Sequence, residues 1–216
     1  MANIEQALQK IAEADRTKST TLDLSGLDLA VLPEQIAYLT SLTTLCCQKN
    51  QLTDLKPLAG LTQLTTLRCW ENQLTTLESL TGLTGLTELN CGDNQLTSLE
   101  PLKDLSQLNG LGCQSNQLTS LQPLTGLTKL NSLYCADNQF TDLKPLAGLT
   151  QLTLLRCPNN QLTSLEPLAK LTKLIALYCA NNQLVDLEPL AALTQLKKLD
   201  CQDNKIFTVI YHINQL

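Results

Sequence analysis

The chain has 216 residues, of which 43% are hydrophobic, 16% are charged and 3% are aromatic, and its formal net charge at pH 7 is −5. This acidic balance provides no basic footprint for nucleic acid or for an anionic membrane surface, so neither is expected as a partner. A membrane-spanning helix is not expected either, because the sequence contains no apolar run of about 18 residues.

Residues 1–18 are predicted to form an N-terminal capping helix. Ile4, Ala7, Leu8 and Ile11 recur at helical spacing. Repeat proteins cover the open apolar end of their first unit with a terminal element of this kind. The segment is charged and lacks the apolar stretch of a secretory signal. We therefore expect a cytoplasmic location, with secretion as the alternative if a signal peptide preceded this sequence.

The repeats begin with a unit at residues 19–41 that is one residue longer than the others. Ile36 and Leu39 lie in its second half, where later units carry a proline followed by leucine. Seven repeats of 22 residues follow at 42–195, and a terminal repeat that also serves as the C-terminal cap occupies 196–216. A fixed period in this range indicates stacked supersecondary units.

Each 22-residue repeat carries the frame Leu-x-x-Leu-x-Cys-x-x-Asn, as at Leu64, Leu67, Cys69 and Asn72. Leu67 and Cys69 alternate with outward residues, and this period of two predicts a short strand. Strands of successive repeats must then pair in parallel, with leucine and cysteine facing inward. Most repeats continue with Pro-Leu-x-x-Leu, which leaves room for 3-10 or irregular turns rather than full α-helices.

One asparagine recurs in every repeat without a slip in spacing. An asparagine amide both donates and accepts hydrogen bonds, so one side chain can satisfy backbone groups of its own turn and of the adjacent turn. The spacing therefore predicts a ladder of hydrogen-bonded side chains. Its members are Asn50, Asn72, Asn94, Asn116, Asn138, Asn160, Asn182 and Asn204.

Eight of the nine cysteines share one inward position. Neighbouring copies would stack about 4.8 Å apart, wider than the Cβ separation of roughly 3.8 Å in a disulfide. We therefore expect a ladder of reduced, buried thiols and a reducing compartment. A metal array is the alternative, but a line of thiols offers no tetrahedral cluster. The ninth cysteine, Cys46, is expected to face outward, either as a bystander or as a reactive thiol. The ladder comprises Cys47, Cys69, Cys91, Cys113, Cys135, Cys157, Cys179 and Cys201.

The C-terminal end carries no polar cap. Either Phe207, Ile210 and Tyr211 close the last coil, or a further domain or a second subunit covers it. We favour closure by the chain itself and keep self-association through this coil as the alternative.

These repeats resemble leucine-rich repeats, specifically the 22-residue class of internalins and phosphatase-regulating proteins. The cysteine at the third apolar position is similar to that of some bacterial members. The resemblance runs from Leu22 to Leu216 and implies an α/β solenoid. In this leucine-rich-repeat horseshoe, parallel strands would form the concave face and short 3-10 or irregular turns the convex face.

No set of residues indicates an enzyme. The single histidine, His212, lies in the terminal coil, and no nucleophile motif precedes it. Gly110 and Gly112 lie in a strand rather than in a phosphate-binding loop. Asp93 and Asp137 precede ladder asparagines, where short polar residues suit a turn better than a calcium site. We expect no catalytic residue, no cofactor and no metal.

Variation between repeats is concentrated on the predicted concave face. The candidate partner-binding residues on this face are Arg68, Trp70, Tyr134, Arg156 and Tyr178. Tryptophan, tyrosine and arginine dominate binding hot spots, although aromatic residues also decorate half-exposed sheets without binding anything. Three glycines are expected to leave a low saddle between the tryptophan and the first tyrosine: Gly92, Gly110 and Gly112.

The sequence therefore predicts a non-catalytic module that binds a protein or peptide on its concave face. Acidic neighbours of the candidate residues are expected to favour a partly basic partner; these are Glu71, Glu88, Asp93 and Asp137. The alternative is a structural or assembly unit, or a fragment of a larger protein, that acts through its terminal coil.

Overall fold

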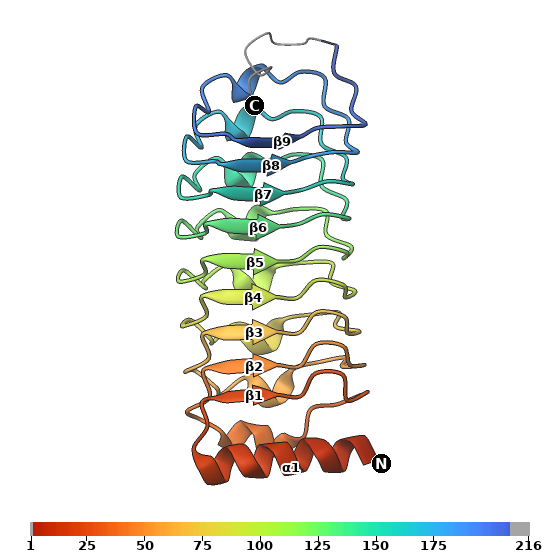
Figure 1. The fold of residues 1–216 in the computed structure, drawn as a ribbon, viewed down its shortest axis with the longest axis vertical. Helices are drawn as coiled ribbons and strands as arrows, with labels where there is room; N and C mark the ends of the chain where they lie inside the picture. Colours follow the sequence, from red (N-terminus) through yellow and green to blue (C-terminus); the bar gives the residue numbers. More distant parts are fainter. Residues whose placement is uncertain (1, 208–216) are drawn as a thin grey trace.

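Nine three-residue strands, one in each coil, pair in chain order into a single parallel sheet (Figure 1). The computed structural model describes residues 2–207. The strands are β1 (Thr21–Asp23), β2 (Thr44–Cys46), β3 (Thr66–Arg68), β4 (Glu88–Asn90), β5 (Gly110–Gly112), β6 (Ser132–Tyr134), β7 (Leu154–Arg156), β8 (Ala176–Tyr178) and β9 (Lys198–Asp200). Equivalent residues lie opposite one another, so that Leu67 pairs with Leu45 and with Leu89. The predicted parallel solenoid is confirmed.

Short 3-10 helices line the opposite side of the coils, as predicted. They are η1 (Glu34–Tyr38), η2 (Lys56–Leu58), η3 (Glu78–Leu80), η4 (Glu100–Leu102), η5 (Gln122–Leu124), η6 (Lys144–Leu146), η7 (Glu166–Leu168) and η8 (Glu188–Leu190). Proline lies in the first turn of six of them, where its missing N–H removes no helical hydrogen bond. The longer η1 accounts for the register of 23 residues between Thr21 and Thr44.

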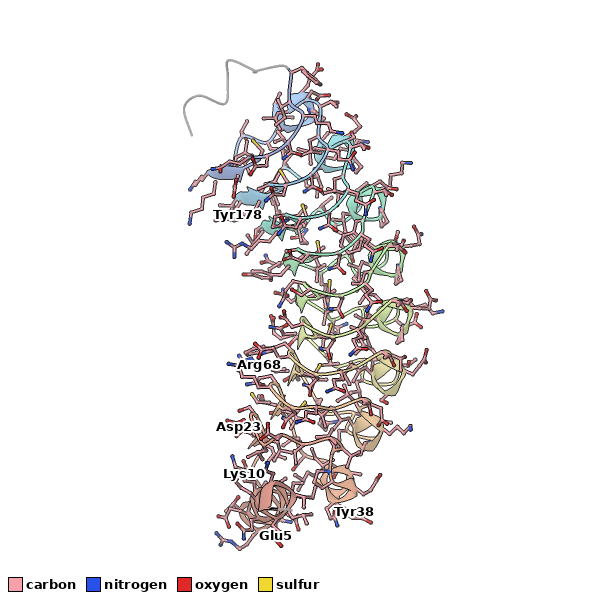
Figure 2. All side chains as sticks on the ribbon, turned by 90° about the vertical axis from the view of Figure 1, so that its right-hand side faces the viewer. Glu5, Lys10, Asp23, Tyr38, Arg68 and Tyr178 are labelled. Atoms are coloured by element: carbon pink, nitrogen blue, oxygen red, sulfur yellow. The ribbon has the colours of Figure 1, made fainter. Side chains whose placement is uncertain are left out.

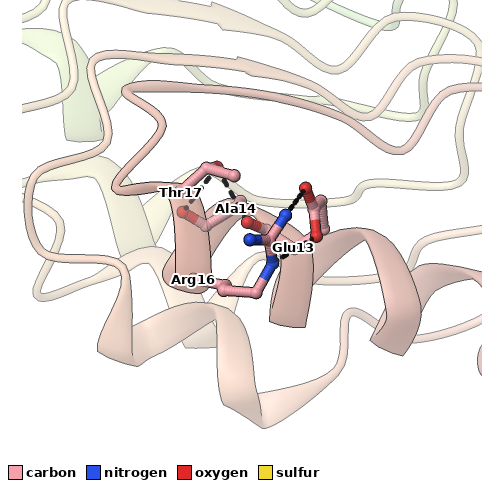
Figure 3. Close-up of polar contacts among 4 residues, drawn as sticks. All are labelled: Glu13, Ala14, Arg16 and Thr17. Atoms are coloured by element: carbon pink, nitrogen blue, oxygen red, sulfur yellow. Dashed lines mark hydrogen bonds and ion pairs between the residues drawn. The ribbon is translucent and has the colours of Figure 1, made fainter.

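Helix α1 (Ala2–Thr17) lies at the base of the stack, next to β1 (Figure 1). Ala7, Ile11 and Ala14 are buried against the first coil, which confirms the predicted capping helix. Figure 3 shows the polar contacts of its last turn, where Arg16 Nε donates to Glu13 Oε2 at 2.9 Å. Within residues 2–207, no helix combines the length and the apolar character needed to cross a membrane.

The asparagine ladder joins consecutive coils. Asn138 Nδ2 donates to the carbonyl oxygens of Cys113, Cys135 and Ala136 at 3.0, 3.4 and 3.0 Å. Its Oδ1 accepts from the backbone N–H of Leu118 at 3.0 Å. A single amide thus satisfies backbone groups of two coils, as the sequence predicts.

The residue before each ladder asparagine has a left-handed backbone conformation. Asp137 has a φ of 54°, and equivalent residues fall between 51° and 58°. Asn and Asp adopt this region more readily than most side chains do. Short polar residues at this position therefore serve the turn, which is the interpretation preferred above over calcium.

The cysteine ladder is confirmed. All nine cysteines are free, and seven of the eight ladder members are buried, while Cys201 of the last coil is half-buried. Burial raises the pKa of Cys91 and of Cys157 to about 12, because a thiolate inside the apolar core would lose its solvation. Cys46 is half-buried on the outer side of β2.

The predicted closure of the last coil by Phe207 is wrong. Its side chain is 85% exposed, and its backbone N–H donates to the carbonyl oxygen of Val185 at 3.2 Å. Ile206 packs against the core instead, and alternation along the extended chain then directs the next side chain outward. Ile210 and Tyr211, also predicted to close the coil, lie outside the described residues, as does His212.

Candidate binding surface on the concave sheet

Alternation along each strand separates the core from the concave surface. In β6, Leu133 points into the core, while the flanking Ser132 and Tyr134 face outward. Figure 2 shows Arg68 and Tyr178 on the strand side of the molecule and Tyr38 on the side of the 3-10 helices. The surface described below is therefore built by the strands alone and by the turns that directly follow them.

Tyr134, Arg156 and Tyr178 lie side by side on three consecutive strands. The guanidinium carbon of Arg156 lies 4.2 Å from the centroid of the Tyr178 ring and 5.9 Å from that of Tyr134. Both distances fall within the range of a cation–π contact. A hollow of about 440 Å³ opens at this cluster, and Gln114 and Asp200 contribute to its walls.

A second hollow, of about 420 Å³, lies over the middle strands. Arg68 and Glu88 line it on one side and Ser132 on the other. Gln114 and Tyr134 line both hollows and so form the boundary between them. Together the two hollows extend along the concave sheet from β3 to β9.

The glycine saddle differs from its prediction in two respects. The hollow lies between Arg68 and Tyr134, and Trp70 does not line it. Its floor is also not bare, because the Glu88 carboxylate lies over Gly110 and Asn90 Oδ1 lies 2.8 Å from where a Cβ on Gly112 would be. Glycine therefore admits polar side chains from the neighbouring strand rather than leaving empty space.

Trp70 stands apart from the other candidate residues. It is half-buried, and Lys49 Nζ of the preceding coil lies 5.1 Å from the centroid of its ring. The structure thus groups Tyr134, Arg156 and Tyr178, places Arg68 at the far side of the adjoining hollow, and separates Trp70 from both hollows.

Sequence reasoning did not single out Lys49, Gln114 or Asp200. Each occupies an outward or turn position of its repeat, but a lysine, a glutamine or an aspartate is common at any exposed position. Their proximity to the aromatic residues across neighbouring strands is the only feature that marks them.

The three arginines of the chain differ in their partners. Arg16 pairs with Glu13 on α1. Within residues 2–207, neither Arg68 nor Arg156 has a carboxylate within 4.0 Å; Arg68 contacts only the sulfur of Cys46, at 3.8 Å, and Arg156 donates no hydrogen bond. The concave surface therefore presents guanidinium groups that lack an anionic partner.

Two of the neighbouring carboxylates, in contrast, are already engaged. Asp93 Oδ2 accepts from Gln114 Nε2 at 3.3 Å, and Asp137 Oδ1 accepts from Asn159 Nδ2 at 2.7 Å. These contacts reduce the pull that the two acids would exert on a basic partner. Among the described residues, no group of three or more His, Cys, Asp or Glu side chains is placed to hold a metal ion.

Comparison with known families connects this surface to a class of proteins. The family described as Leucine Rich repeats (2 copies) matches residues 40–82, 62–104, 106–148, 150–192 and 172–209. The chain belongs to the leucine-rich-repeat family. A comparison of this leucine-rich-repeat protein with curated proteins gives no match.

Solved structures identify an internalin-like form of the repeat. Internalin C2 from Listeria monocytogenes is 38% identical with a TM-score of 0.83, over 87% of this chain and 83% of that one. The functional domain of InlJ from the same organism, described as including a cysteine ladder, is 26% identical with a TM-score of 0.53, over 93% and 60%. This leucine-rich-repeat protein is thus similar to bacterial internalins and shares a cysteine ladder with one of them.

A third similar structure contains a bound partner. It is the ectodomain of the plant receptor kinase GASSHO1/SCHENGEN3 from Arabidopsis thaliana, solved in complex with CASPARIAN STRIP INTEGRITY FACTOR 2. Identity is 26% and the TM-score 0.74, over 85% of this chain and 24% of that one. Leucine-rich-repeat proteins of these kinds are generally non-catalytic interaction scaffolds, and the family assignment places this chain among them.

Proposed function

We propose that this leucine-rich-repeat protein binds a protein or peptide on its concave face, with Tyr134, Arg156 and Tyr178 at the centre of the contact. One observation carries the proposal: these three side chains stack on adjacent strands and border a hollow. Arg68, on the wall of the adjoining hollow, would extend the contact along the sheet. Trp70 would contribute at its edge.

Physical chemistry supports this choice of residues. Tyrosine and arginine are among the residues that most often cost 2 kcal/mol or more when truncated at an interface. Their stacking fixes side-chain conformations before binding, which lowers the entropy lost on association. By strand spacing, Arg68 and Tyr178 lie about 24 Å apart, enough for an extended segment or the edge of a domain. Residues that merely decorated the sheet would not need to converge on one hollow.

Affinity capture from a lysate of the source organism tests the proposal. Three immobilised baits are compared by quantitative mass spectrometry: the native chain, Tyr134→Ala/Tyr178→Ala, and the control Tyr38→Ala. Tyr38 is 80% exposed on the opposite face, so its truncation removes the same kind of side chain away from the sheet. A partner retained by the control and lost by the double variant, and then bound by the purified native chain, supports the proposal. Equal recovery by all three baits rejects it.

A second candidate function is assembly through the C-terminal coil. Phe207 and Val185 are 85% and 45% exposed, and they are adjacent in neighbouring coils. An exposed apolar pair at this end would suit contact with a second copy or a further domain. Light scattering of the native chain and of Phe207→Ser provides the test. A concentration-dependent oligomer that becomes monomeric in the variant supports assembly, whereas a native chain that is already monomeric rules out self-association.

A further inference from the structure

We infer that Arg156 is an anchor for a carboxylate, and that the partner is therefore a polypeptide segment that places an aspartate or glutamate side chain in the hollow between Tyr134 and Tyr178. This inference rests on the proposed function and specifies the chemistry of its partner. It revises the expectation of a partly basic partner.

The stacking geometry prepares Arg156 for this role. A guanidinium is planar, and its five N–H donors lie in its plane. Stacking on the Tyr178 ring at 4.2 Å occupies the face of the group and leaves these in-plane donors available. Within residues 2–207, no carboxylate lies within 4.0 Å of Arg156 and no hydrogen bond uses its donors. A carboxylate can accept two parallel hydrogen bonds from one such group.

The surrounding charges favour a monoanion over a phosphate. The hollow contains one guanidinium, from Arg156, and one carboxylate, from Asp200. Asp200 lies two strands away, about 10 Å by strand spacing, and its Oδ1 accepts from the backbone N–H of Gln202 at 3.4 Å. A single carboxylate matches the one guanidinium. A phosphate group carries a charge of about −1.5 to −2, is usually recognised by arginine clusters, and would leave excess negative charge facing Asp200.

Peptide display measures this preference directly, because the library itself supplies the ligands. A library of random linear peptides is selected on the immobilised native chain, and clones are kept only if Tyr178→Ala abolishes their binding. We expect the kept clones to be enriched in aspartate or glutamate relative to the unselected library. Fluorescence anisotropy then gives the affinity of one kept peptide and of its analogue with that acid changed to the corresponding amide.

Two arginine variants locate the contact on the protein. Arg156→Gln is expected to weaken binding of the acidic peptide at least about tenfold, because a charge-assisted hydrogen bond is lost. The same substitution should change affinity for the amide analogue much less. Arg16→Gln is the matched control, since it removes the same charge from α1, where the side chain pairs with Glu13. It should leave both affinities unchanged.

The possible failures are distinguishable. If no selected peptide depends on Tyr178, the proposed function fails together with this inference. If peptides depend on Tyr178 but bind equally well as acid and amide, or are unaffected by Arg156→Gln, the binding surface stands and the carboxylate assignment is overturned. A phosphoserine analogue that binds more than about tenfold tighter than the acid would also overturn it in favour of phosphate.

Discussion

Leu133 and Tyr134 are neighbours on strand β6, yet they belong to two regions that follow different rules. Inside the solenoid, Leu133 stacks between equivalent leucines, and leucine occupies the middle position of all nine strands. Outside, Tyr134 lies between Gly112 and Arg156, two residues that differ from it in size and charge. The same backbone therefore supports a uniform core and an irregular surface.

The difference shows which constraint acts on each region. Coils that repeat at about 4.8 Å present identical space to every inward side chain, so one residue type fits at every level. Outward positions contact solvent and the side chains of adjacent strands, and they tolerate glycine, tyrosine or arginine without changing the register. Binding specificity can thus be changed there at little cost in folding stability, and each prediction below contrasts the two regions.

The largest expected effect is alkaline destabilisation by the thiol ladder. Burial raises the pKa of Cys91 and of Cys157 from about 9 to about 12, and it raises the pKa of the other five buried thiols as well. Above pH 9, thiols of the unfolded chain lose protons that the folded chain retains, so the free energy of unfolding falls as pH rises from 9 towards 12. Each buried thiol costs about 1.4 kcal/mol per pH unit, so the seven together should approach the whole stability of a typical domain near pH 10.

Urea unfolding at pH 8, 9 and 10 in the presence of a reductant, followed by far-ultraviolet circular dichroism, measures this dependence. In Cys91→Ala/Cys157→Ala, two of the seven contributing thiols are absent, and the loss of stability per pH unit should be smaller by about 3 kcal/mol. An unchanged slope in the double variant would show that the ladder does not control alkaline unfolding.

Asn138→Ala is expected to have the next largest effect. The substitution removes an amide that contacts four backbone groups of two coils, and it leaves these groups buried without their partner. The expected loss is about 3 kcal/mol in the free energy of unfolding. Gln139→Ala is the control, because it truncates an exposed amide at the next residue and should cost less than about 0.5 kcal/mol. Similar urea midpoints for the two variants would contradict the role of the ladder.

These two regions also differ in how far the sequence predicts them. The period of 22 residues predicts the strand register, the asparagine hydrogen bonds and the cysteine ladder, because each depends on contacts between equivalent residues. The six prolines likewise predict the 3-10 turns. Phe207 was misplaced because closure of the last coil breaks the period. The period describes the stacked interior and carries no information about its ends.

The concave surface depends on contacts between non-equivalent residues, so its details could be predicted only in part. Composition and position identified Tyr134, Arg156 and Tyr178. Neither feature could show that Trp70 pairs with Lys49, or that Glu88 lies over Gly110. Such contacts depend on the side-chain conformations of adjacent strands, which the repeat pattern does not determine.

Tyr178→Ala sharpens the comparison from the surface side. We expect affinity for a concave-face partner to fall by about 2 kcal/mol, roughly 30-fold, because the ring both contacts the partner and holds Arg156. Trp70→Ala should weaken binding less, since Trp70 lines neither hollow. Isothermal titration with the captured partner or a selected peptide ranks the two variants. The reverse order would move the centre of the contact towards the N-terminal coils.

The smallest effect is expected for Gly110→Ala, directly beside a residue with a large one. A methyl group at position 110 would displace only the flexible end of Glu88, and a strand glycine is itself about 0.5–1 kcal/mol less favourable than alanine. The urea midpoint should therefore change little. Leu111→Ala, one residue further along β5, removes a side chain that is 1% exposed and should cost about 3 kcal/mol through the cavity it leaves. If Gly110→Ala proves as costly as Leu111→Ala, the concave surface is under the same packing constraint as the core, and variation there could not be assigned to binding.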